Sequence, residues 1–120
     1  MASDRIYSLR KDEATIVEQV EIADRFWSRT RGLLGVPRLG PGRGLLLSPC
    51  SAVHTFFMRF PIDLVFLDSD CRVRKIVRNV RPGRMVRGGK GACSVLEMES
   101  GWFSANSLHQ GDRVALVSRK

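Results

Sequence analysis

The chain has 120 residues, of which 43% are hydrophobic and 27% are charged, and its formal net charge is +8. This length fits one compact domain, and the composition is that of a globular protein rather than of a disordered chain. Arg59 and Asp63 interrupt the longest apolar stretches, which excludes a membrane-spanning segment. We therefore expect an N-terminal arm at residues 1–13 and a single globular domain at residues 14–118.

The compartment and the redox state are constrained by the N-terminus and the cysteines. Charged residues are frequent among the first twenty positions, so the chain as given lacks the apolar core of a secretory signal. We expect a cytoplasmic protein, or an envelope or periplasmic one if a leader was removed. The cysteines Cys50, Cys71 and Cys93 are odd in number and widely spaced, which favours free thiols over a disulfide framework.

The first half of the chain predicts two strands and a helix. Alternation over residues 14–22 predicts a half-buried strand. Apolar residues at helical spacing after Asp24 predict a helix over residues 24–34, which Gly35 ends. A glycine-rich loop then leads to a short buried strand at residues 45–47.

A hairpin is predicted next. Residues 62–67 are apolar at both parities, which is typical of a strand that is covered on both faces. Asp68, Ser69 and Asp70 form the turn, and residues 72–80 return as the partner strand. In this second strand Arg74 and Arg78 share parity with Ile76, which indicates a bulge or a sheet edge.

The C-terminal part predicts a loop at residues 82–91, a strand at 92–98, a short helix at 100–107 and a last strand at 114–117. Long helices between the strands are lacking, so we do not expect parallel crossovers. We predict an α+β, mostly β fold: a small antiparallel curled sheet or partly open barrel with two short helices.

The segment from Cys50 to Asp63, CSAVHTFFMRFPID, combines reactive groups with large apolar side chains. An extended conformation would place His54 on its more apolar face, and we predict a pocket lined by His54, Met58 and Asp63. Cys50 and His54 are also the residue types of a thiol catalyst. Four positions along a strand separate them by about 13 Å, so they meet only if the chain turns. We favour a buried cysteine, and we assign no catalytic residue, metal ligand or cofactor.

One stretch carries a net charge as large as that of the whole chain. Residues 72–90 carry eight basic residues and no acidic one, so their net charge equals the +8 of the whole chain. Such a stretch attracts anions, although it is also typical of a solvated strand and loop. The predicted anion-binding residues are Arg74, Arg78, Arg81, Arg84, Arg87 and Lys90.

Several motifs carry a family resemblance. They are GLLG around Leu33, GLLL from Gly44, HTFFMRFPIDLVFLD from His54, VLEMESG from Val95 and GDRV from Gly111. In order and spacing over residues 14–117 the chain resembles the bacterial and archaeal family known as domain of unknown function 192. The resemblance implies a small, mostly β domain, with a leader in many members, and supplies no established activity and no catalytic residue.

Three functions are compatible with the residues. We favour a non-enzymatic, monomeric binding module that takes an anionic small molecule or polyanion near His54 and Asp63 with the help of the basic stretch. The first alternative is a nucleic-acid-binding protein that uses the same arginines for phosphates. The second is a thiol-dependent hydrolase centred on Cys50 and His54.

Overall fold

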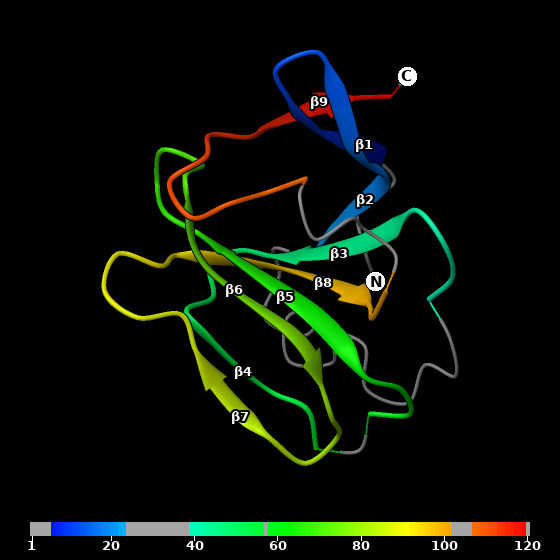
Figure 1. Cartoon of the computed structure of the whole chain (residues 1–120), viewed down its shortest axis with the longest axis vertical. Coiled ribbons are helices and arrows are strands. Elements are labelled where there is room, and N and C mark those ends of the chain that lie inside the picture. The colour runs from blue at the N-terminus through cyan, green and yellow to red at the C-terminus, as the bar shows by residue number, and fades with distance from the viewer. Residues whose placement is uncertain (1–5, 24–38, 57, 102–106, 120) are drawn as a thin grey trace.

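The computed structural model describes residues 6–23, 39–56, 58–101 and 107–119, and these residues form two sheets (Figure 1). One sheet has seven strands in the order β6-β5-β8-β3-β2-β1-β9, and the other pairs β4 with β7. The strands are β1 (Ile6–Lys11), β2 (Ala14–Ala23), β3 (Arg43–Leu47), β4 (Ala52–His54), β5 (Ile62–Leu67), β6 (Val73–Val80), β7 (Met85–Arg87), β8 (Ser94–Glu99) and β9 (Ala115–Ser118). Nowhere in these ranges is there a helix long and apolar enough to cross a membrane.

The mostly β fold is confirmed, and the predicted strands appear as β2, β3, β5, β6, β8 and β9. The hairpin of β5 and β6 is confirmed too, with two register irregularities and with β6 at the edge of the sheet. The helix predicted over residues 24–34 lies outside the described residues, as does most of the helix predicted over 100–107. The described part of the chain is therefore all β structure.

The seven-stranded sheet is open, with β6 and β9 at its edges, so it does not close into a barrel. The predicted antiparallel pairing is wrong in one place, because β2 and β3 pair in parallel from Gln19 opposite Arg43 to Ala23 opposite Leu47. A parallel pair needs a connection of about a dozen residues or more, and the long segment between these strands supplies it.

A further strand lies within the range that we predict as an N-terminal arm. Strand β1 pairs antiparallel with both β2 and β9, and its Leu9 is fully buried. Its sequence, IYSLRK, has little apolar alternation, so its place in the sheet comes from its two neighbours rather than from its own pattern.

Strand β5 divides the core into two clusters, because all six of its side chains are buried. Val65 and Leu67 belong to a cluster on one face of the sheet, with Leu9, Val17, Val20 and Leu96. Ile62, Leu64 and Phe66 belong to a cluster on the other face. This second cluster also includes Leu45, Leu47, Val53, Met58, Phe60 and Val95. The small sheet of β4 and β7 thus contributes to the cover of one face of the large sheet.

Glu97 of β8 is the unusual member of this interior. It lies opposite Leu45 and Leu64 in the neighbouring strands, and only 4% of its surface is exposed. Within the described chain its Oε1 has no hydrogen-bond partner. Burial raises the pKa of its carboxyl group to about 7, because desolvation penalises the charged form.

We therefore predict a pH-dependent stability that Glu97 causes. Between pH 4.5 and about 7 the folded protein keeps a proton that the unfolded chain releases, so the free energy of unfolding falls as the pH rises through this window. The total loss should approach about 3 kcal/mol. Urea denaturation of Glu97→Gln should lack this slope, and an unchanged slope in the variant would contradict the assignment.

Candidate functional site

The candidate site is built on the pair of strands β4 and β7, here called the ribbon. Val53 pairs with Val86, and both side chains pack toward the second core cluster. Side chains alternate along a strand, so His54 and its partner Met85 point outward. Arg87, which lies opposite Ala52, is exposed on the same outer face.

At Gly88 one end of the ribbon packs closely against the large sheet. The Gly88 N–H donates to the carbonyl of Ser51 at 2.8 Å, which extends the ribbon beyond β4 and β7. A Cβ at this position would collide with the ring of Phe66 in β5 and with Ala92. Only glycine allows the backbone to approach β5 this closely.

The other end of the ribbon is fixed by Thr55, which is fully buried. Its hydroxyl accepts from the N–H of Arg84 at 2.8 Å and donates to the carbonyl of Arg81 at 2.7 Å. The hydroxyl therefore bridges the turn of residues 81–84, in which Gly83 has a φ of 88°. The Thr55 backbone adds bonds to Arg84 and Gly83 at 2.7 and 3.0 Å. Arg81 and Arg84 are thus carried on a turn whose backbone is fixed.

Cations from strand β6 reach the same region. Lys75 Nζ donates to the carbonyl of Arg87 at 2.8 Å, which links the edge of the large sheet to the ribbon. The guanidinium group of Arg74 lies beside Gly91, because a Cβ on that glycine would stand 3.4 Å from Arg74 Nε. The structure therefore brings Arg74 and Lys75 close to the segment that carries Arg87 and Lys90.

The side chains of Arg81, Arg84, Arg87 and Lys90 are exposed. In the described residues none of them has a carboxylate within ion-pairing distance. Arg78 differs, because its Nη1 lies 3.7 Å from Asp63 Oδ2. The segment 81–90 thus presents positive charge that no carboxylate of the described residues neutralises.

His54 and Phe56 form an exposed pair of rings beside these cations. Their centroids are 5.4 Å apart and the ring planes differ by 30°, which is a stacked arrangement. Phe56 is 43% exposed and Met85, opposite His54, is 64% exposed. The expectation that His54 faces the apolar interior is wrong, because the chain turns after Thr55, with Met58 N donating to the Thr55 carbonyl at 3.1 Å.

The other two residues of the predicted pocket are buried. Met58 is 7% exposed and packs in the second core cluster. Asp63 is 1% exposed, and its carboxylate accepts from the N–H of Asn79 at 2.7 Å, from Gly101 N–H at 3.2 Å and from the Ser100 hydroxyl at 3.2 Å. Asp63 therefore joins β6 to the end of β8. Neither residue lies beside His54 on the outer face.

Cys50 and His54 have different surroundings. The Cys50 thiol donates to the carbonyl of Ala52 at 3.1 Å, and the side chain packs at the border of the second core cluster. His54 stacks on Phe56 at the surface. No group of three or more potential metal ligands occurs in the ranges that the structure describes.

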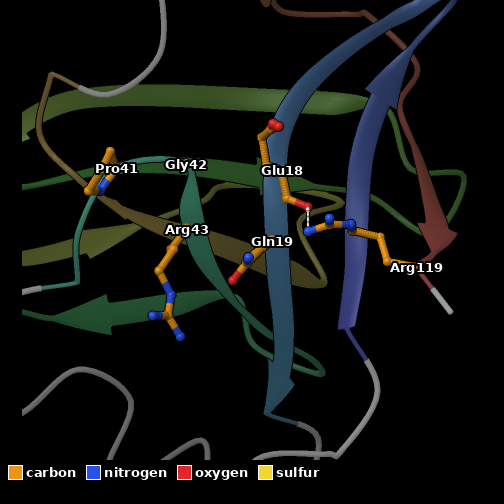
Figure 2. A pocket seen from close by; sticks show the side chains of 6 residues that line it. All are labelled: Glu18, Gln19, Pro41, Gly42, Arg43 and Arg119. Carbon is orange, nitrogen blue, oxygen red and sulfur yellow. Dashed lines mark hydrogen bonds between the residues drawn. The ribbon is translucent and has the colours of Figure 1, made fainter.

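A separate hollow lies between β2 and β3 (Figure 2). It has a volume of about 460 Å³ and is lined by Glu18, Gln19, Pro41, Gly42, Arg43 and Arg119. Arg119 donates to the Glu18 carbonyl at 3.1 Å, and Arg43 lies 3.6 Å from Glu21. Both positive and negative side chains therefore line this hollow, whereas the ribbon carries positive charge only.

Sequence reasoning missed Thr55, Phe56 and Met85. The signal for Thr55 is its parity with Val53, which marks both as inward-facing once β4 is known. Met85 stands in a stretch of arginines and glycines that is typical of a loop, and three residues are too few to show alternation.

We predict that Thr55 stabilises the protein through its hydroxyl group. Thr55→Val keeps the shape but leaves Arg84 N–H and the Arg81 carbonyl without this partner, so the free energy of unfolding should fall by about 1–3 kcal/mol. Thr55→Ser keeps the hydroxyl and should restore much of this loss in denaturant titrations. Greater destabilisation by Thr55→Ser than by Thr55→Val would show that the methyl group, not the hydrogen bonds, matters.

Comparison with known proteins gives relatives of two kinds. The chain is 32% identical over 100 residues to a UPF0127 protein of Thermococcus sibiricus, covering 80% of this chain and 64% of that protein. It is 32% identical over 106 residues to a UPF0127 protein of Pyrococcus abyssi, covering 83% and 87% of the two chains. It therefore spans somewhat less than two thirds of the length of the Thermococcus relative.

Two solved structures share the fold. One is a protein of unknown function from Novosphingobium aromaticivorans, with a TM-score of 0.79, 22% identity and coverage of 92% of this chain and 83% of that one. The other is a candidate transcription regulator from Sinorhizobium meliloti, with a TM-score of 0.78, 23% identity and coverage of 93% and 92%. Residues 7–116 match the family described as Uncharacterized ACR, DUF192. The chain belongs to this family of uncharacterised function, as the motifs from Leu33 to Gly111 predict.

Proposed function

We propose that this protein is a binding module for an anionic ligand, and that the ligand binds along the ribbon and the adjoining basic segment. The observation that carries the proposal is the set of exposed side chains at Arg81, Arg84, Arg87 and Lys90, which have no acidic partner among the described residues. Uncompensated charges of one sign raise the local concentration of oppositely charged ligands.

The fixed backbone beneath these side chains supports the proposal. Thr55 holds the turn that carries Arg81 and Arg84, and Gly88 holds the ribbon against β5. A site whose backbone is ordered before binding loses less conformational entropy when the ligand arrives. Arginine also suits phosphate groups, because its planar fork donates two parallel hydrogen bonds.

The remaining predicted residues have distinct places in this proposal. Arg74 lies at Gly91 and extends the basic surface from β6. Asp63 supports the site from within, because its carboxylate pairs with Arg78 and holds Asn79. Met58 packs beneath the ribbon, and His54 lies at its surface. In this proposal the anion contacts His54 and the arginines directly. Met58 and Asp63 do not contact the anion and act only through the residues that they support.

Linear inorganic polyphosphate is a suitable probe, because it carries phosphates without bases or sugars. The double variant Arg84→Glu with Arg87→Glu should lower its affinity by at least about tenfold at low salt, since counterion release makes such binding charge- and salt-dependent. Isothermal titration at several salt concentrations measures both the affinity and the slope of its logarithm against salt.

The matched control is Arg10→Glu with Arg119→Glu. Arg10 lies in β1 and Arg119 directly follows β9, at the opposite side of the sheet from the ribbon (Figure 1). Both double variants lower the net charge of +8 by the same four units. An equal loss of affinity in both would mean that net charge alone attracts the probe, and absence of binding by the wild type at low salt would refute the proposal.

A further inference from the structure

The ribbon offers more than positive charge, because exposed apolar and aromatic groups gather on its outer face. Only four large hydrophobic residues in the described ranges are exposed, and two of them, Phe56 and Met85, flank His54. Met85 is the direct cross-strand partner of His54, and Phe56 stacks on the imidazole ring. Directly opposed side chains in antiparallel strands lie close enough to touch. Phe56, His54 and Met85 therefore form one continuous surface, here called the ring platform.

Arginines border the ring platform. Arg87 is two positions from Met85 on the same outward face of β7, and Arg84 directly precedes Met85. The hydrogen bonds of Thr55 fix the backbone of both Thr55 and Arg84, the residues that adjoin Phe56 and Met85 in the chain. The hydrogen bonds of the Thr55 hydroxyl and backbone thus hold the platform and its nearest cations in a fixed relation.

We infer that this surface binds single-stranded nucleic acid, with an unpaired base stacked on the ring platform and phosphates held by Arg84 and Arg87. The inference rests on the proposed anion-binding function and names the ligand class for it. Aromatic faces bind bases of any sequence once those bases are unpaired, and a basic groove follows the backbone beside them. A base in a duplex is already stacked on its neighbours and is not available to the platform.

Two other anionic partners fit the surface less well. An acidic peptide would use the arginines but would leave the flat faces of His54 and Phe56 without a matching group. An anionic membrane needs apolar side chains that protrude, whereas the rings of His54 and Phe56 stack on each other, with their planes 30° apart. The combination of a stacked ring pair with forked cations is complementary to a base joined to a phosphate.

The test compares two ligands of equal charge: an oligothymidylate and an abasic oligonucleotide of the same length. Fluorescence anisotropy should show that the bases tighten binding by about fivefold to a hundredfold, as expected for stacking on one or two aromatic groups. Phe56→Ala should remove most of this preference, while Phe56→Tyr should keep it. Val117→Ala is the matched control, because Val117 is also 43% exposed but lies on β9.

The preference is a ratio of two affinities measured on one preparation, so partial unfolding of a variant lowers both and leaves the ratio unchanged. Equal binding of both oligonucleotides to the wild type would overturn the inference but would leave polyphosphate binding by the arginines intact. A failure to bind polyphosphate as well would refute both proposals. Stronger binding to phosphatidylglycerol vesicles than to either oligonucleotide, lost in Phe56→Ala, would also overturn the inference in favour of a membrane surface.

Discussion

The arrangement of this protein depends on the burial of β5 on both faces. All six side chains of the strand are apolar or, at Asp63, fully hydrogen-bonded, so each face of the sheet requires cover. The ribbon supplies part of that cover through Val53 and Val86, and Gly88 brings it against Phe66. Because the pleat alternates, packing these two valines inward forces His54, Met85 and Arg87 outward. The composition of the candidate site is thus a consequence of how the core is closed.

Two buried polar side chains hold this arrangement, and a third weakens it. Thr55 satisfies the turn that carries Arg81 and Arg84, and Asp63 joins β6 to the end of β8. Each makes several hydrogen bonds, which is how a buried polar group avoids its desolvation penalty. Glu97 lacks a partner for Oε1 in the described chain, and burial raises the pKa of its carboxyl group because desolvation penalises the charged form. Thr55 therefore affects both stability and the geometry of the site, whereas Glu97 affects stability through its protonation.

The sequence predicts those parts of the fold whose patterns are local. The apolar run of β5, the turn at Asp68 and the alternation of β2 are each readable within ten residues. The parallel pairing of β2 with β3 and the position of β1 between β2 and β9 depend on contacts between distant segments, which no local pattern encodes. The ribbon was missed for the same reason, since β4 and β7 have three residues each and are paired across 31 positions from His54 to Met85.

The positive charge of the candidate site can be predicted from the sequence, but which of its other side chains face outward cannot. The basic stretch is visible as eight cations without an acid, and its exposure follows from its composition. The different exposure of His54 and Met58, which share parity, was not readable, because a turn after Thr55 reverses which parity faces inward. Met58 therefore enters the core while His54 and Phe56 remain at the surface.

The most direct test of the account is a map of where an anion binds. Two-dimensional NMR of the ¹⁵N-labelled protein, titrated with linear inorganic polyphosphate at low salt, reports on backbone amides throughout the chain. The account predicts that the largest shifts fall on Thr55, on the turn at Gly83 and on Arg84 to Gly88. Shifts concentrated around the hollow of Arg43 and Arg119, or spread evenly over all basic residues, would contradict it.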